Sequence, residues 1–311
     1  MTLPLPDQVS EPPAEPAAEP AAEPATAPTA EPQADSRSAA VRCSGLEYAF
    51  GDTKAVDGLD LTVGAGEVFG LLGPNGAGKT TAIRAITTLL PVPVGMIQVF
   101  GHDTAKEKMA VRRLLGYVPQ QLSADGGLTG RENVSLFARV FDVPRRERAA
   151  RVAEALEAVG LSEAAERMAG TYSGGMVRRL ELAQALVSAP RLLILDEPTI
   201  GLDPIARTSV WERISEIRAA TGMTVLVTTH YMDEAEQYCD RVALMHKGRI
   251  RALGTPERLK ADLADVLESP TLEDVFRHHA GSGLQGSSSD NADGEDFRDV
   301  RRTRRTATRV G

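Results

Sequence analysis

The chain has 311 residues, of which 42% are hydrophobic and 25% are charged, and its formal net charge at pH 7 is −8. This composition is typical of a globular protein with a sizeable core, and no apolar run approaches the roughly 18 residues that a membrane-spanning helix needs. The N-terminus is acidic and rich in proline rather than basic and apolar, so we expect no secretory signal peptide.

Residues 1–40 form a low-complexity segment of Pro, Ala and Glu that we expect to be disordered. The segment holds nine of the nineteen prolines and seven acidic residues against a single Arg. It has too few large apolar side chains to offset the entropy of ordering. We expect a second disordered tail at 281–311, where a cluster of arginines suits either a solvated tail or contact with anionic lipid or RNA. The predicted folded domain, 41–280, is close to neutral and gives no support for nucleic-acid binding.

Three short and continuously apolar runs predict strands that are covered on both faces. They are EVFGLL (67–72), RLLILD (191–196) and MTVLVTT (223–229). Helical periodicity follows each run, so we predict an α/β fold with a largely parallel sheet.

The segment 106–188 is mostly helical in its pattern, and we predict that it forms an inserted helical subdomain. Within RRERAARVAEALEAVG, the apolar residues Val152, Leu156 and Val159 share one helix face. Gly160 is placed to end that helix.

The run GPNGAGKTT (73–81) matches the phosphate-binding pattern G-x-x-x-x-G-K-[ST] and lies between a predicted strand and a predicted helix. Glycines allow backbone N–H groups to approach phosphate oxygens, and the helix N-terminus adds a partial positive charge. We expect Lys79 to reach the β- and γ-phosphates of ATP or GTP and Thr80 to ligate Mg²⁺. The alternative is a glycine-rich turn without a ligand. The residues expected at the nucleotide are Gly73, Pro74, Asn75, Gly76, Ala77, Gly78, Lys79, Thr80 and Thr81.

Two other predicted strands end in residues that suit nucleotide hydrolysis. Asp196 ends one strand and is expected to hold Mg²⁺, while Glu197 is expected to orient and deprotonate the attacking water. The alternative for this pair is a helix cap. His230 follows the third strand, and we expect it to contact the γ-phosphate, because the carboxyl ends of parallel strands lie at one edge of a sheet.

A Ser-Gly-Gly sequence, Ser173–Gly175, precedes an amphipathic run. The apolar positions of that run, Met176, Leu180, Ala183 and Val187, repeat at helical spacing. Taken alone, this stretch predicts either an ordinary helix cap or a set of free N–H groups that bind an anion.

In chain order the motifs are GPNGAGKT, GYVPQ, YSGGM, LLILDEP, GLDP and TTH. This series resembles the nucleotide-binding domain of an ATP-binding cassette (ABC) ATPase over about residues 41–280. The resemblance implies a P-loop NTPase fold of ABC type, with a mostly parallel sheet, an N-terminal antiparallel β region and an inserted α-helical subdomain. It also implies ATP and Mg²⁺ as ligands and ATP hydrolysis as the activity.

The resemblance assigns roles to further residues. Ser173–Gly175 would close on ATP held by the other subunit of a head-to-tail dimer, and Asp203 would lie at the dimer interface. Gln120 would sense Mg²⁺ and the attacking water and would face a membrane partner. Phe50 would stack on adenine; Tyr48 is the alternative, and either ring also suits the core.

YSGGM, together with VFGHD (99–103) and PTLEDVFRHHAG (270–281), resembles the drug-resistance exporter ATPases of the daunorubicin/doxorubicin type. Two residues depart from the common ABC signature: Met176 replaces a frequent Gln, and Tyr172 replaces a frequent Leu. The stretch before PTLEDVF is also shorter than in that subgroup.

The resemblance implies an ATPase subunit that powers export of a small hydrophobic compound of drug or antibiotic type. Its expected partners are a separate membrane-spanning permease and a second identical or paralogous subunit, which would place it at the cytoplasmic face of the cell membrane. We expect no nucleic acid. The alternatives are a subunit of an importer, a soluble ABC ATPase acting on ribosomes or nucleic acid, and a regulatory protein that binds ATP without useful turnover.

Overall fold

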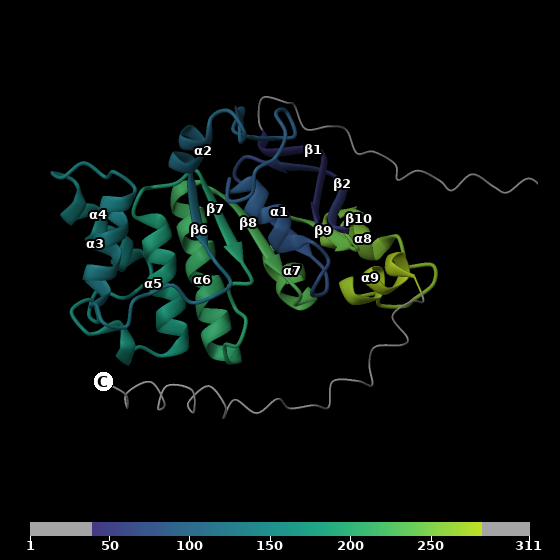
Figure 1. Cartoon of the computed structure of the whole chain (residues 1–311). Coiled ribbons are helices and arrows are strands. Elements are labelled where there is room, and N and C mark those ends of the chain that lie inside the picture. Colours follow the sequence, from purple (N-terminus) through teal and green to yellow (C-terminus); the bar gives the residue numbers. More distant parts are fainter. Residues whose placement is uncertain (1–38, 282–311) are drawn as a thin grey trace, which may run out of the picture. The chain divides into compact units, whose positions relative to one another are not determined.

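Two β-sheets of different type build the part of the chain that the computed structural model describes, residues 39–281 (Figure 1). The predicted tails therefore lie outside the described residues, apart from Ala39 and Ala40, which begin the first strand, and Gly281.

The larger sheet has six strands. These are β3 (Val68–Leu72), β6 (Leu115–Val118), β7 (Leu192–Asp196), β8 (Thr224–Thr229), β9 (Arg241–His246) and β10 (Arg249–Gly254). Their order is β10-β9-β3-β8-β7-β6, and every neighbouring pair is parallel except β9 and β10. The three apolar runs predicted as strands form β3, β8 and β7, which are adjacent in the sheet. The predicted α/β fold with a largely parallel sheet is confirmed.

The smaller sheet is antiparallel and contains the N-terminal hairpin. Its strands are β1 (Ala39–Phe50), β2 (Thr53–Gly64), β4 (Ile97–Val99) and β5 (His102–Asp103), in the order β2-β1-β4-β5. The predicted N-terminal antiparallel β region is therefore present.

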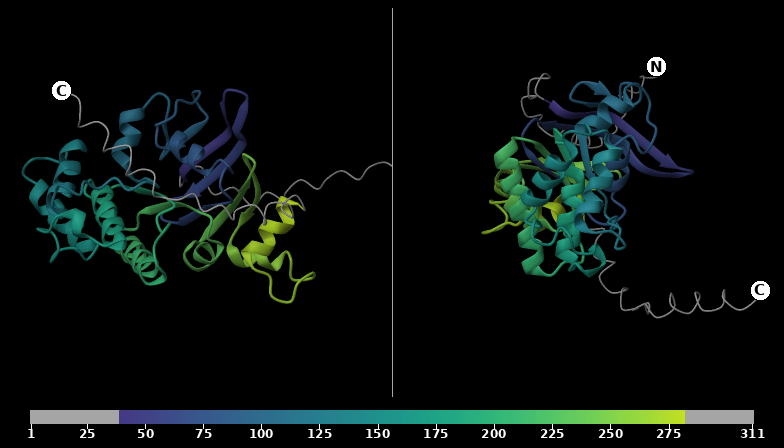
Figure 2. Two further views of the ribbon diagram at one scale, coloured as in Figure 1. Left: turned by 60° about the horizontal axis from the view of Figure 1, so that its bottom comes forward. Right: turned by 90° about the vertical axis from the view of Figure 1, so that its left-hand side faces the viewer.

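Nine helices of the described residues flank the sheets. They are α1 (Lys79–Ile86), α2 (Lys108–Leu114), α3 (Gly130–Val140), α4 (Arg148–Ala158), α5 (Gly174–Leu186), α6 (Pro204–Thr221), α7 (Met232–Tyr238), α8 (Pro256–Ala261) and α9 (Leu272–Ala280). Figure 1 shows α3, α4 and α5 together beside β6, with α8 and α9 beside β10 at the other side. In both views of Figure 2, β1 and β2 lie on the side of the parallel strands opposite α6.

Each central strand contributes to two separate cores, one on each face of the larger sheet. In β7, Leu193 and Leu195 belong to the core beneath α6 and the helical subdomain, whereas Leu192 and Ile194 belong to the core shared with α1 and the smaller sheet. Successive side chains of a strand point to opposite faces, so a strand covered on both sides must be apolar throughout. This explains the continuous apolar runs in the sequence.

The segment 106–188 differs in one respect from the mostly helical pattern predicted for it. It contains β6, which pairs in parallel with β7 inside the larger sheet, so the helices α3–α5 begin only at Gly130. The sequence LGYV of β6 has four residues, too few for its periodicity to separate strand from helix.

The predicted helix that ends at Gly160 is present as α4. Its apolar face is buried through Val152, Leu156 and the following Val159. Gly160 has φ +65°, the left-handed conformation that commonly ends helices. Among residues 39–281, the structure contains no helix with the length and hydropathy needed to cross a bilayer.

Candidate functional site

The loop between β3 and α1 is shaped by glycines at positions where no other residue fits. A Cβ atom on Gly73 would lie 2.2 Å from the carbonyl oxygen of Met245, and one on Gly78 would lie 2.3 Å from that of Ala55. Both glycines also have positive φ, +154° and +107°. Backbone from two other strands therefore presses against this loop and fixes its path.

The first turn of α1 presents free backbone N–H groups to this loop. Gly78 is the N-cap and provides no side-chain acceptor, so an anion has unhindered access to the helix N-terminus. The Lys79 side chain is only 4% exposed and curls into the loop, where Nζ donates to the carbonyl oxygens of Gly73 at 2.7 Å and Pro74 at 3.2 Å.

The polar residues at the strand ends face this loop because β3, β8 and β7 are adjacent and parallel. Leu72 at the end of β3 pairs with Thr229, and Asp196 at the end of β7 pairs with Thr228. Glu197 and His230 follow directly. The structure thus brings together three strand ends that are far apart in sequence, at the carboxyl edge where ligands of parallel sheets bind.

Asp196 is almost fully buried and accepts two hydroxyl hydrogen bonds on Oδ1, from Thr228 at 2.5 Å and from Thr80 at 3.3 Å. Burial raises the pKa of its carboxyl, and the neighbouring Glu197 adds to this, while the two hydroxyls and Lys79 oppose it. A nearby cation would compensate the buried carboxylate.

Glu197 lies between two basic side chains. Its Oε1 is 3.2 Å from Nζ of Lys79, and its Oε2 is 3.2 Å from Nδ1 of His230. Oε2 of Glu197 and Nδ1 of His230 are buried, and neither has a hydrogen-bond partner among residues 39–281. Glu197 also has φ +50°, an unfavourable conformation for a residue with a Cβ. Orphaned polar atoms and backbone strain are typical of functional sites.

A cavity of about 340 Å³ opens over the loop, which is within the range of ligand pockets. Its lining contains Ala55, Pro74, Asn75, Gly76, Ala77, Gly78, Lys79, Thr80, Thr81, Gln120 and Glu197. Gln120 follows β6, so a fourth strand end reaches the same cavity. A second cavity of about 720 Å³ borders it and is lined by Gly73–Asn75, His230–Asp233 and residues of α7 and α9.

Few side chains beneath the loop could bind a metal ion, and those present offer oxygen atoms. Within the described range, no cluster of three or more His, Cys, Asp or Glu side chains is placed to bind an ion. The Thr80 hydroxyl and the Asp196 carboxylate lie side by side under the loop. This set fits Mg²⁺, which takes oxygen ligands and usually keeps waters and substrate phosphates in its coordination sphere.

The predicted signature residues are located elsewhere in the chain. Ser173 is the N-cap of α5, with Oγ accepting from the N–H of Met176 at 3.3 Å, and Asp203 is the N-cap of α6. The two helix starts touch, since a Cβ atom on Gly175 would lie 2.9 Å from Cβ of Ala206. None of these residues is part of the lining of the cavity over the loop.

Three aromatic or apolar residues singled out in the sequence have distinct surroundings. Phe50, at the end of β1, is 51% exposed, and its ring centre is 5.1 Å from that of Tyr48, which packs on the core. Tyr172 is buried and its hydroxyl donates to the Ala164 carbonyl at 2.6 Å, a hydrogen bond that leucine at this position could not make. Met176 packs against the core beneath the helical subdomain.

Thr228 and Ala55 also belong to the site, although no sequence pattern predicted a role for either residue. Thr228 donates to the Asp196 carboxylate and also accepts the backbone N–H of Glu197 at 3.1 Å, so it contacts both residues. The run MTVLVTT contains three threonines, and nothing in the sequence distinguishes Thr228 from the other two. Ala55 reaches the cavity through the packing of the smaller sheet, which leaves no local signal in the sequence.

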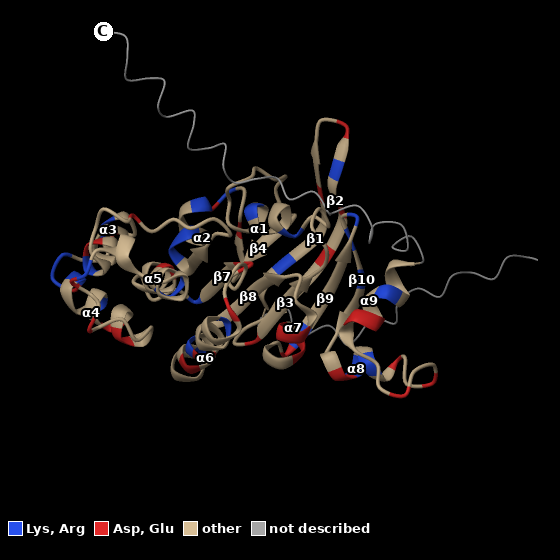
Figure 3. Ribbon diagram, turned by 90° about the horizontal axis from the view of Figure 1, so that it is seen from below, with Lys and Arg blue, Asp and Glu red and all other residues tan. Residues whose placement is uncertain are grey.

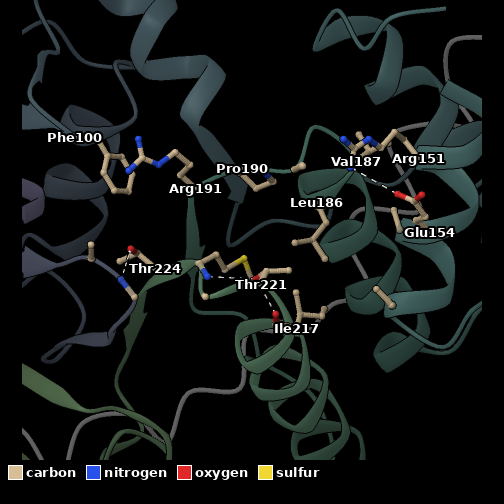
Figure 4. A pocket seen from close by; sticks show the side chains of 17 residues that line it. Phe100, Arg151, Glu154, Leu186, Val187, Pro190, Arg191, Ile217, Thr221 and Thr224 are labelled. Carbon is tan, nitrogen blue, oxygen red and sulfur yellow. Dashed lines mark hydrogen bonds and ion pairs between the residues drawn. The ribbon is translucent and has the colours of Figure 1, made fainter. Parts of the chain in front are cut away.

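A cavity of about 490 Å³ lies at the opposite end of the parallel strands (Figure 4). Its lining includes Arg191, just before β7, and Thr224, the first residue of β8. The Arg191 guanidinium lies 3.9 Å from the centre of the Phe100 ring. This cavity is separate from the strand ends that carry Asp196 and His230.

On the outer helices α4, α6 and α8, basic and acidic residues are interspersed (Figure 3).

The sequence model of the ABC transporter family matches residues 56–200, which include the loop, Ser173–Gly175 and Glu197. The chain is 48% identical over 236 residues to the daunorubicin/doxorubicin resistance ATP-binding protein DrrA of Streptomyces peucetius, covering 76% of this chain and 71% of that protein. It is 43% identical over 220 residues to the Nod factor export ATP-binding protein I of Rhizobium sp. (strain N33), covering 71% and 72%.

Solved structures agree with this similarity. A dimeric ATP-binding cassette in a post-hydrolysis state, bound to ADP and Pi, superimposes with a TM-score of 0.61 at 26% identity. The superposition covers 69% of this chain and 98% of that one.

Proposed function

This chain belongs to the ABC transporter family of ATP-binding subunits, and from that premise we propose that it hydrolyses ATP to power export of a small hydrophobic compound of drug or antibiotic type. Membrane-spanning permease subunits would be separate polypeptides. The observation that carries the proposal is the convergence of Lys79, Asp196, Glu197 and His230 at adjacent strand ends around one phosphate-sized loop. Similarity to proteins named for drug resistance and for Nod factor export supports the direction of transport.

Nucleotide binding rests on the loop. The backbone N–H groups of Gly76, Gly78 and Lys79 and the Lys79 ammonium would hold the β- and γ-phosphates, as such loops do. Phe50 would stack on adenine; its ring is exposed, and Ala55 of the same hairpin lines the cavity. Thr80, Asp196 and Gln120 would hold Mg²⁺, which neutralises phosphate charge when it is bound.

Binding of ATP would change the environment of Glu197. Lys79 donates to two loop carbonyls and pairs with Glu197. A γ-phosphate takes over this lysine, which leaves Glu197 without its cation and facing the attacking water. Glu197 would then be free to accept a proton from that water. His230, beside Glu197 at the end of β8, would donate to the γ-phosphate.

Catalysis would require a second subunit. Ser173 opens α5 with Gly174 and Gly175, and the free N–H groups of this helix start suit an anion. They do not reach the nucleotide cavity of their own chain. In a head-to-tail pair they would close on ATP held by the partner, with Asp203, which caps the neighbouring helix, at the interface. The pair is a homodimer or contains a paralogue.

The subunit would work at the cytoplasmic face of the cell membrane, attached through its permease. Leu122, just after Gln120, and Leu136 on α3 are exposed apolar residues suited to that contact.

The decisive test is recovery of tagged Glu197→Gln from membranes in the presence of ATP, with Lys79→Ala as the control. The proposal expects a membrane-spanning protein that accompanies Glu197→Gln and is lost with Lys79→Ala. Recovery from the soluble fraction with ribosomes or DNA, or without any spanning protein, would overturn the export function.

A further inference from the structure

The second turn of α5 contains a buried ion pair that the catalytic roles above do not use. Arg178 and Glu181 are only 3% and 1% exposed, and Nη1 of the first lies 2.9 Å from Oε2 of the second. Both belong to the helix that begins at Ser173, one and two turns further on.

The remaining polar atoms of this pair bind the segment 119–123, which follows β6 and contains Gln120. Arg178 donates from Nη1 to the carbonyl oxygen of Pro119 at 2.8 Å and from Nη2 to that of Gln120 at 2.5 Å. Oε1 of Glu181 accepts from both the N–H and the hydroxyl of Ser123, the latter at 3.2 Å. Both ends of the segment are therefore attached to α5 by charged groups.

The hydrogen bonds from Arg178 and Glu181 to residues 119–123 are not needed merely to neutralise two buried charges. Well-packed apolar residues often replace a buried ion pair without loss of stability, whereas the planar guanidinium offers several donors in a fixed geometry that apolar residues lack. The pair is therefore suited to holding one backbone segment at one position on the helix.

We propose that Arg178 and Glu181 are positioning residues that fix Gln120 relative to Ser173, an inference that rests on the proposed function. The Gln120 side chain lines the nucleotide cavity of its own chain, and Ser173 starts the helix that would close on the partner's nucleotide. A helix is stiff over two turns, so a displacement of 119–123 moves the start of α5 with it. A permease pressing near the exposed Leu122 would thereby act on the neighbouring ATP site.

The test replaces both charges by apolar side chains in the full chain, R178M/E181L. We expect the melting temperature to fall, because the hydrogen bonds to Pro119, Gln120 and Ser123 are lost, and KM for ATP to stay within about threefold below the transition. We expect kcat of the folded variant to fall by about tenfold or more, because a misplacement of about 1 Å in an active site has effects up to about 100-fold. A purely structural role predicts wild-type kcat at temperatures where the variant is fully folded, and that result would overturn the inference.

R178K provides a second variant in case the apolar pair does not fold. Lysine keeps the charge but cannot reach Pro119, Gln120 and Glu181 together, so kcat should fall while the melting temperature is retained; unchanged kcat would contradict the inference. The matched control is R213A/E216A, an exposed ion pair with the same i, i+3 spacing on α6, which should leave kcat unchanged. If wild type itself fails to hydrolyse ATP in this assay, the proposed function fails instead.

Discussion

Lys79 and Glu197 form an ion pair inside the nucleotide cavity, with Nζ and Oε1 3.2 Å apart and the two side chains only 4% and 5% exposed. One residue is the proposed phosphate ligand and the other the proposed base, so the two groups neutralise each other's charge. Substrate would separate them, because phosphate competes for the ammonium. Substitution of Glu197 should therefore impair hydrolysis, whereas substitution of Lys79 should impair ATP binding.

Glu197→Gln should bind ATP but hydrolyse it at least about 100-fold more slowly, since loss of one contact to the reacting groups typically removes roughly 2.7–4 kcal/mol of transition-state stabilisation. The amide keeps the shape of the side chain and cannot accept the proton of water. Phosphate release gives the rate, and size-exclusion chromatography with ATP should show a trapped dimer. Near-normal turnover would refute Glu197 as the base, and the exposed Glu216→Gln is the control.

Lys79→Ala should lose tight ATP binding, because no other cation in the lining of the cavity reaches the loop phosphates. The variant also leaves Glu197 buried without its partner. Equilibrium binding of a fluorescent ATP analogue measures the effect, with the exposed Lys106→Ala as control. Retained micromolar affinity would show that Lys79 does not hold the phosphates.

Mixing two inactive variants tests whether Ser173 acts across the dimer. In a head-to-tail pair of Lys79→Ala with Ser173→Arg, one site has both substitutions and the other has neither. An equal mixture should recover up to about a quarter of the wild-type rate, because half of the dimers are mixed and each contains one intact site. No recovery, with mixed dimers demonstrated by two tags, would place Ser173 and Lys79 in the same site of one chain.

Asp196→Asn should stabilise the fold while abolishing hydrolysis. Burial raises the pKa of Asp196 in the folded protein, so the folded state binds this proton more readily than the unfolded chain. The free energy of unfolding therefore falls as pH rises from the ordinary pKa of about 3.9 through the raised value. Asn keeps Oδ1 for Thr228 and removes the ionisation, so the variant should be more stable than wild type at neutral pH.

Urea unfolding of Asp196→Asn and wild type across this pH range provides the measurement. The exposed Asp265→Asn should follow wild type at every pH. An Asp196→Asn variant that is less stable than wild type at pH 7 would contradict the burial argument.

Gly73→Ala should lower the free energy of unfolding by more than Gly76→Ala. At Gly76 the new methyl meets open space and only the positive φ is unfavourable, about 1–2 kcal/mol. At Gly73 the methyl also meets the backbone oxygen of Met245 at 2.2 Å, which adds about 1–3 kcal/mol of overpacking. Equal losses in urea unfolding would show that the loop relaxes around the clash.

The parts of the site that the sequence predicted are those set by strand ends. Lys79, Asp196 and His230 each follow a continuous apolar run, and parallel pairing brings the ends of such runs to one edge. Contacts that depend on the packing of distant elements left no comparable signal. The attachment of 119–123 by Arg178 and the proximity of Gly175 to Ala206 join segments whose patterns are independent of each other.

The same distinction explains the fold. The three strands of five or six residues were predicted, whereas β6 was not, because its four residues are too few to show a period. Thr228 is polar within a buried strand, and its role becomes clear only beside Asp196 and Glu197.

The positive φ of Glu197 has an evolutionary consequence. Glycine would occupy this backbone conformation without the strain of about 1–3 kcal/mol. It would also leave the buried Lys79 ammonium without its carboxylate partner, which costs about 3–5 kcal/mol. A screen for heat resistance alone should therefore keep glutamate at this position, so its retention in a relative is not by itself a sign of selection for ATP hydrolysis.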